Sequence, residues 1–312
     1  MKCFYHNDPD GWCSAFWVRK YLEREGIPFT REDFIEMNYD KEFPMDIISE
    51  GEQVFIVDFS IDPDQMFTLI SKTHCSPVWI DHHKSAIERY DGYTCPNGNN
   101  IAGIRWDGIA ACALTWSYFF HELIDDPFYA WDKLHTPDEI MQGIPLFTQY
   151  IHLWDTWQWK RECYQEQLAI ECFITYLTSL NPHPLDEVWD KLSTDRSNEL
   201  YNAVDRGVHM LDFRNGYAAG LCKDISKVIE FEGHRCLVCN MGHVSSEWFK
   251  SVEPSTYDIL MPFYYSMQSN QFIFSLYCSN PDIDVSKIAV KYGGGGHKGA
   301  AGFQCKDLPF KN

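Results

Sequence analysis

The sequence of 312 residues has no apolar run of the length that a membrane-spanning helix needs. Its longest apolar stretch, residues 108–120 (GIAACALTWSYFF), predicts a buried helix instead. The first residues, MKCFYHNDPDG, are acidic where a secretory signal would need an apolar core, so we expect no signal peptide. The twelve cysteines stand mostly singly, several in apolar surroundings such as Cys112 and Cys172, which is typical of reduced thiols. We therefore expect a cytoplasmic protein with no membrane partner.

Paired cysteine motifs are nearly absent. Cys236 and Cys239 have the spacing of a redox or zinc motif, but they lie in an apolar, strand-like stretch and no second pair accompanies them. We therefore predict that both thiols belong to a core.

Positive charge is also scarce. The chain carries 26 Lys and Arg against 45 Asp and Glu, which gives a formal net charge of −19. Residues 1–224 hold 18 Lys and Arg and 37 Asp and Glu, whereas residues 225–312 hold eight of each. Because non-specific nucleic-acid binding depends on many contacts between basic side chains and phosphates, this surface disfavours a long polyanion. It favours a short or small phosphorylated substrate.

Apolar, β-prone segments alternate with amphipathic helical ones in the first part of the chain. Strands are expected at 2–5, near Phe29, at 53–57 and at 78–80, with helices at 12–25 and 63–72. This β-α-β-α-β order predicts an α/β fold with a doubly wound, mostly parallel sheet. Further helices are expected at 108–120, at 138–155 and through 185–223, followed by short strands from Lys227. We predict a catalytic domain at 1–184, a helical connector at 185–224 and a smaller α/β domain at 225–312.

Acidic and histidine side chains follow three of the predicted strands. They are His6, Asp8 and Asp10 after the first strand, Asp58 after QVFIV, and Asp81, His82 and His83 after VWI; Asp155 follows a largely apolar helical segment. Strands of an open α/β sheet present ligand-binding groups at their carboxyl ends, so these side chains are expected to meet. Carboxylates with imidazoles suit Mn²⁺, Fe²⁺ or Zn²⁺, and two such ions can clamp a phosphoryl transfer. The alternative is that some of these acids only cap helices, Asp10 above all.

These segments carry a resemblance to the DHH-family phosphoesterases, which include RecJ-like exonucleases, nanoRNases, pAp phosphatases and cyclic-dinucleotide phosphodiesterases. The stretches HNDPDG (6–11), VDFS (57–60) and IDHHKS (80–85) resemble the first three family motifs, and WDTW (154–157) resembles the fourth. GGGGHKGAAGF (293–303) resembles the signature of the DHH-associated C-terminal domain.

The resemblance implies a site for two Mn²⁺ ions, with Mg²⁺, Fe²⁺ or Co²⁺ as alternatives. His6, Asp8 and Asp58 would hold one ion, and Asp10, Asp58, His82 and Asp155 the other, so that Asp58 bridges them. Asp81 would orient an imidazole, and His83 would contact the scissile phosphate or the leaving oxygen.

The glycine run is expected to bind substrate. Its backbone N–H groups can turn towards an anion, with His297 and Lys298 adding donors, and small residues are expected to open a helix after it. The expected contacts are Gly293, Gly294, Gly295, Gly296, His297, Lys298 and Tyr277. In the family an arginine that grips phosphate precedes the glycine run, and Tyr277 stands there in this sequence, with Lys291 or Lys298 as compensating cations.

The leading hypothesis is a Mn²⁺-dependent phosphodiesterase, exonuclease-like, which binds and cleaves short oligonucleotides or dinucleotides. A pAp-type nucleotide phosphatase or an exopolyphosphatase is the enzymatic alternative, and a nucleotide-binding protein without catalysis is the alternative from another class. The sequence leaves open which of these applies and whether the chain forms homo-oligomers.

Overall fold

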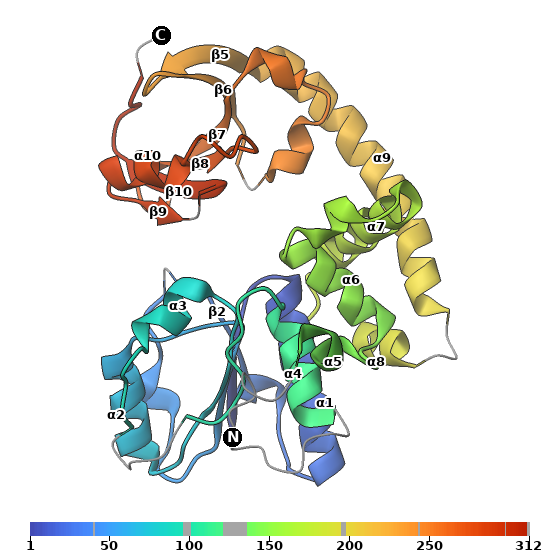
Figure 1. Cartoon of the computed structure of the whole chain (residues 1–312), viewed down its shortest axis with the longest axis vertical. Coiled ribbons are helices and arrows are strands. Elements are labelled where there is room, and N and C mark those ends of the chain that lie inside the picture. Colours follow the sequence, from blue (N-terminus) through green and yellow to red (C-terminus); the bar gives the residue numbers. More distant parts are fainter. Residues whose placement is uncertain are drawn as a thin grey trace. The chain divides into compact units, whose positions relative to one another are not determined.

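The computed structural model describes residues 1–39, 41–95, 101–120, 136–194, 198–242, 244–296 and 298–310 (Figure 1). It forms two compact units, Met1–Met210 and Leu211–Asn312. No helix among these residues is both long and apolar enough to cross a membrane.

The N-terminal unit contains a parallel sheet of four strands in the order β2-β1-β3-β4. The strands are β1 (Lys2–His6), β2 (Phe34–Met37), β3 (Val54–Val57) and β4 (Val78–Ile80). β2 begins five residues later than the strand expected near Phe29, because Thr30 and Asp33 close a capping box around a short 3₁₀ turn. The predicted parallel α/β architecture is confirmed.

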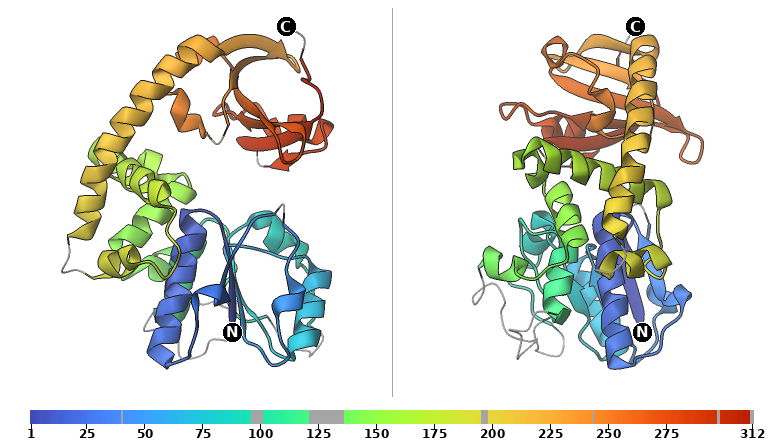
Figure 2. Two further views of the ribbon diagram at one scale, coloured as in Figure 1. Left: turned by 180° about the vertical axis from the view of Figure 1, so that it is seen from behind. Right: turned by 90° about the vertical axis from the view of Figure 1, so that its right-hand side faces the viewer.

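Helices cover both faces of this sheet, α1 and α4 on one side and α2 on the other (Figures 1 and 2). Alternate strand residues supply two separate cores: Phe55 and Val57 pack with α1 and α4, whereas Val54 and Ile56 pack with α2. The bounds are α1 (Pro9–Glu25), α2 (Pro63–Thr73), α3 (Lys84–Arg89) and α4 (Ala111–Phe120). The sheet is therefore doubly wound, as predicted.

The helix expected over 138–155 is two helices, α5 (Pro137–Met141) and α6 (Leu146–Asp155). Gly143 between them is left-handed, with φ +80°, and Pro145 has no N–H to continue a helix. The single-helix prediction was wrong for this reason.

The helices that follow are α7 (Tyr164–Leu180), α8 (Glu187–Ser193) and α9 (Glu199–Ile225). Trp189 of α8 is fully buried in the core shared with α1, and Asp190 forms an ion pair with Arg19 at 2.7 Å. Close packing of α9 on α7 requires Gly207, since a Cβ there would lie 2.0 Å from the carbonyl oxygen of Cys172.

The C-terminal unit contains a mixed sheet in the order β5-β6-β7-β8-β10-β9, in which only β6 and β7 are parallel. Its elements are β5 (Ser226–Phe231), β6 (His234–Asn240), β7 (Ile259–Ser266), β8 (Gln271–Tyr277), α10 (Val285–Lys291), β9 (Gly295–Gly296) and β10 (Ala300–Cys305). Cys236 and Cys239 are free and fully buried in two different hydrophobic clusters, which confirms the core prediction. The residues after the glycine run form β10, so the prediction that a helix begins there was wrong.

Candidate metal centre

The turn from β1 into α1 places His6 and Asp8 side by side. Asp8 is the N-cap of α1 and accepts a hydrogen bond from the Gly11 N–H at 2.9 Å, with Pro9 next to it at the start of the helix. Nδ1 of His6 lies 2.6 Å from Oδ2 of Asp8. Gly11 is needed here because a Cβ would meet the His6 carbonyl oxygen at 2.1 Å.

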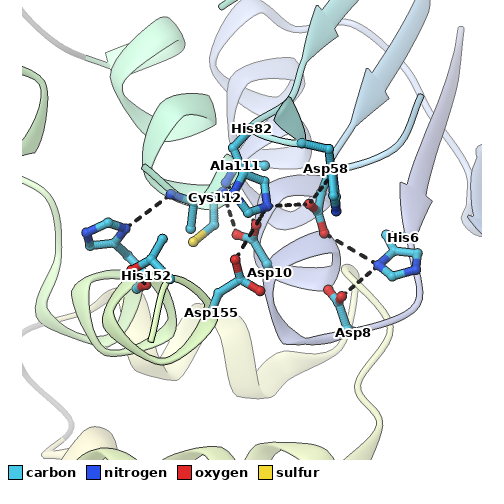
Figure 3. A network of polar contacts seen from close by, with 12 residues as sticks. His6, Asp8, Asp10, Asp58, His82, Ala111, Cys112, His152 and Asp155 are labelled. Atoms are coloured by element: carbon cyan, nitrogen blue, oxygen red, sulfur yellow. Dashed lines mark hydrogen bonds and ion pairs between the residues drawn. The ribbon is translucent and has the colours of Figure 1, made fainter. Parts of the chain in front are cut away.

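Asp10 caps a different helix from the one that sequence reasoning assigned to it. It is 1% exposed, and its two carboxylate oxygens accept the N–H groups of Ala111 at 2.8 Å and Cys112 at 2.7 Å, at the start of α4. Nδ1 of His152 accepts the preceding N–H, from Ala110, at 3.1 Å (Figure 3). Asp10 therefore points away from its own helix terminus and into the cluster, where each oxygen keeps a second lone pair for a ligand.

His152 is a residue that sequence reasoning missed. It lies three positions before Asp155 on α6, a spacing that puts two side chains on one helical face, and that spacing was the available signal. Burial lowers the pKa of His152 to about 4, so the ring is a neutral acceptor that holds α4 in place beside Asp155.

Asp58 lies at the centre of the cluster. It follows β3 in a left-handed conformation with φ +52°, and its own N–H donates to the Ile80 carbonyl at 2.9 Å. The side chain is 1% exposed, and neither carboxylate oxygen has a hydrogen-bond partner among the described residues. A buried carboxylate that accepts no hydrogen bond is costly, so this position favours a bound cation.

Asp81 orients the two histidines that follow β4. Asp81 is fully buried, and its Oδ1 accepts the N–H groups of His82 at 2.7 Å and His83 at 3.1 Å. The same oxygen lies 2.7 Å from Nδ1 of His83, which fixes that ring and leaves its Nε2 to face a ligand. The sequence prediction that Asp81 orients an imidazole now has a specific partner, His83.

His82 joins the two halves of the cluster. Its Nε2 lies 3.3 Å from Oδ1 of Asp58, 3.4 Å from Oδ2 of Asp155 and 3.5 Å from Oδ2 of Asp10 (Figure 3). Burial lowers the pKa of His82, which favours the neutral imidazole that binds metal ions.

Three groups of candidate ligands have their ligand atoms within 4.8 Å of one another. They are His6, Asp8 and Asp58; Asp10, His82 and Asp155; and Asp58, His82 and His83. The structure thus brings together all six residues predicted to bind metal, together with Asp81 and His83. The assignment of each ligand to a first or second ion stays a prediction.

The carboxylates of the cluster lie close enough to repel one another. Burial raises the pKa of Asp58 well above its ordinary value, and the neighbouring carboxylates of Asp10 and Asp8 raise it further. Burial likewise raises the pKa of Asp155, with Asp10 adding to the effect. Divalent cations would relieve this repulsion, and the set of carboxylates and imidazoles suits them, so the residues present fit a metal centre.

His6 and His83 each lie next to a carboxylate, which raises the pKa of the imidazole by more than burial lowers it. Burial opposes ionisation of Asp8, but the hydrogen bond and the charge of His6 lower its pKa to about 2. For His83, burial favours the neutral ring, whereas the hydrogen bond to Asp81 raises its pKa to about 9. Without a bound ion, the pKa values of the His6 and His83 imidazoles are therefore raised, in contrast to that of His82.

Several of the residues predicted to contact substrate in the C-terminal unit have partners within that unit. Tyr277 donates its hydroxyl to the Val244 carbonyl at 3.2 Å, and Lys291 pairs with Glu232 at 2.6 Å. The N–H groups of Gly293 and Gly294 donate to carbonyls of α10, and Gly295 and Gly296 pair with β10. Lys298 is exposed, and His297 lies outside the described residues. The roles of these residues in binding substrate stay predictions.

No family model matches the chain. An uncharacterized protein of Acanthamoeba polyphaga mimivirus is 26% identical over 97% of this chain and 67% of its own length. The structure of the pGpG-specific phosphodiesterase PggH from Vibrio cholerae has a TM-score of 0.47 and is 12% identical over 97% of this chain and 92% of that one. RecJ in complex with Mn²⁺ from Thermus thermophilus also has a TM-score of 0.47 and is 13% identical over 97% of this chain and 49% of that one. The DHH domain of a member of the s1p family of ribosomal proteins has a TM-score of 0.58, at 11% identity over 96% of this chain and 81% of that one. The chain therefore shares the fold of DHH-family proteins over nearly its whole length.

Proposed function

We propose that this chain is a metal-dependent phosphoesterase of the DHH family, which hydrolyses phosphate esters of short oligonucleotides or dinucleotides. The observation that carries the proposal is Asp58, a buried carboxylate with no hydrogen-bond partner for either oxygen, set between two groups of His and Asp ligands. A purely structural carboxylate would be paired at this depth.

The ligands divide around Asp58 in the way that a two-ion site needs. His6 and Asp8 lie on one side, and Asp10, His82 and Asp155 on the other, so that each oxygen of Asp58 faces one group. Two divalent cations bound here, Mn²⁺ in the first instance, would lower the pKa of a water nucleophile and neutralise charge on the phosphate.

His83 is proposed to contact the substrate. Its Nδ1 is held by Asp81, so its Nε2–H can donate a hydrogen bond to a phosphate oxygen or to the leaving oxygen. Asp81 acts behind it as a positioning residue. His83, like His6 and Asp58, lies at the end of a strand, which gives the precise placement that such catalysis requires.

The short substrate is proposed from charge. The excess of acidic residues lies entirely before residue 225, in the part of the chain that carries the metal centre. An acidic surface repels extended polyanions, whereas a dinucleotide presents only one or two phosphates, which the metal centre itself neutralises.

The test is a hydrolysis panel with Mn²⁺ against EDTA, using pApA, longer RNA and DNA, c-di-AMP, pAp and polyphosphate. We expect pApA to be cleaved fastest and every activity to disappear in EDTA. Asp58→Asn should remove the activity, whereas Asp64→Asn, at an exposed acid on α2, should leave it unchanged. Activity in EDTA, or full activity of Asp58→Asn, would contradict the metal mechanism; preference for pAp or polyphosphate would replace the proposed substrate.

A further inference from the structure

Tyr39 is an aromatic residue beside the metal centre that belongs to none of the motifs above. It follows β2, at the same carboxyl edge of the sheet as the metal ligands. Its ring centroid lies 5.7 Å from that of His6 and 6.3 Å from that of His83. The ring therefore stands beside the two histidines at the edge of the cluster.

The ring is both supported and accessible. One face stacks on Phe59, with centroids 4.9 Å apart and planes inclined by 27°, and Phe59 itself is 3% exposed. Tyr39 is nevertheless 57% exposed. Because Phe59 covers one face, a ligand can reach the ring only at the surface that this contact leaves exposed.

The polar end of Tyr39 is turned towards the protein. Its hydroxyl lies 3.5 Å from the hydroxyl of Ser60, a residue that is 6% exposed. Phe59 and Ser60 directly follow Asp58, so the segment that carries the central carboxylate also holds the tyrosine ring in place. What Tyr39 offers to a ligand is its aromatic face.

The surroundings determine which ligand fits this face. Tyr39 lies among other rings, with Phe59 on one face and the rings of His6 and His83 beside it, and its side chain offers no charge to a second anionic group. A nucleobase is planar and uncharged, and stacking of a base on an aromatic side chain is favourable whatever the base.

We propose that Tyr39 forms the wall of a base-binding subsite, on which the nucleobase next to the scissile phosphate stacks. The inference rests on the proposed function and deepens it: it makes the substrate a nucleotide ester rather than polyphosphate or a simple sugar phosphate. Tyr39 contacts substrate through its ring, and its hydroxyl is not required.

The test compares Tyr39→Phe, Tyr39→Trp and Tyr39→Leu, where leucine keeps apolar contact with Phe59 but offers no aromatic face. Three substrates are used with Mn²⁺: a 5′-phosphorylated dinucleotide, and the two compounds that lack one or the other of its bases. For Tyr39→Leu we expect KM for the complete dinucleotide to rise about tenfold, with KM for one of the two abasic compounds unchanged. Tyr39→Phe and Tyr39→Trp should keep KM within about twofold.

A binding measurement gives a second readout that does not depend on turnover. With Ca²⁺ in place of Mn²⁺, a dinucleotide carrying 2-aminopurine should lose fluorescence on binding to the unsubstituted protein, to Tyr39→Phe and to Tyr39→Trp, but much less on binding to Tyr39→Leu. Tyr201→Leu, at a tyrosine that is 75% exposed on α9, is the matched control and should behave as the unsubstituted protein.

The outcomes separate this inference from the proposed function. Equal KM changes for complete and abasic substrates would overturn it, because Tyr39 would then act through the metal centre. Unchanged KM and unchanged quenching in Tyr39→Leu would overturn it as well. Absence of turnover of every ester with Mn²⁺ would instead reject the proposed function, while 2-aminopurine quenching would still decide whether the subsite exists.

Discussion

The two units of the chain differ in how many of their described buried polar atoms lack a hydrogen-bond partner. Among the described residues, five buried side-chain polar atoms have no hydrogen-bond partner, and all of them lie in the N-terminal unit. Three of the five are carboxylate oxygens of Asp58 and Asp81. In the C-terminal unit Lys291, one of the cations considered for substrate binding, pairs with Glu232 at 2.6 Å.

This difference points to the N-terminal unit as the part of the chain that contains the reactive site. A folded unit tolerates an unpaired buried carboxylate only if something else stabilises it, and the N-terminal unit has gathered its acids around one point. In the C-terminal unit, by contrast, the described side chains of Tyr277 and Lys291 have partners within the unit. The following predictions test that contrast, from the largest expected effect to the smallest.

Removal of divalent metal should have the largest effect, and it should act through the N-terminal unit. We expect EDTA to abolish phosphoester hydrolysis and Mn²⁺ to restore it. Since a ligand that binds only the folded state at a hundred times its Kd stabilises by about 2.7 kcal/mol, Mn²⁺ should also raise the melting temperature. Calorimetry with and without EDTA checks this; equal melting temperatures would mean that the acids bind no ion.

Gly11→Ala should damage the N-terminal unit at the point where α1 meets β1. The added Cβ would lie 2.1 Å from the His6 carbonyl oxygen, so the helix that carries Asp8 and Asp10 must shift. We expect a loss of at least about 3 kcal/mol of unfolding free energy and loss of activity.

The matched control is Gly216→Ala on α9. A Cβ there meets nothing within 4 Å, so replacing a glycine inside a helix should stabilise by about 0.5–1 kcal/mol. Denaturant unfolding of both variants makes the comparison. Equal effects would show that the turn at Gly11 is less constrained than the geometry implies.

Asp58→Asn should stabilise the metal-free protein although it removes activity. The substitution takes away a buried charge that has no hydrogen-bond partner and that lies among other carboxylates. In EDTA we expect a gain of about 1–3 kcal/mol of unfolding free energy, because the neutral amide avoids the charge burial and the repulsion from Asp10 and Asp8 that the carboxylate meets. Thermal melts in EDTA and in Mn²⁺ are the measurement: the variant should melt higher than the unsubstituted protein in EDTA and should gain little from Mn²⁺. A lower melting temperature in EDTA would argue that Asp58 is structurally paired.

The metal centre was more predictable from the sequence than the details around it. Acids at the ends of apolar strands are visible in sequence because parallel strands bring their carboxyl ends to one edge, and Asp58 and the Asp81 segment follow that rule. The capping of α4 by Asp10 was not visible, since its partners lie about a hundred positions away at Ala111 and Cys112. Strand β10 was missed because Gly and Ala carry little strand preference, and its pairing with β8 decides the conformation.

Tyr277→Phe should have the smallest effect, and it tests the C-terminal half of the comparison. The hydroxyl of Tyr277 donates to the Val244 carbonyl at 3.2 Å, so its removal should cost about 0.5–1.5 kcal/mol of unfolding free energy. If that internal bond is its role, KM for a 5′-phosphorylated dinucleotide should stay within about twofold. A clear rise in KM with unchanged stability would move Tyr277 to the substrate, as its position before the glycine run first suggested, and would mean that the C-terminal unit exchanges internal hydrogen bonds for substrate contacts on binding.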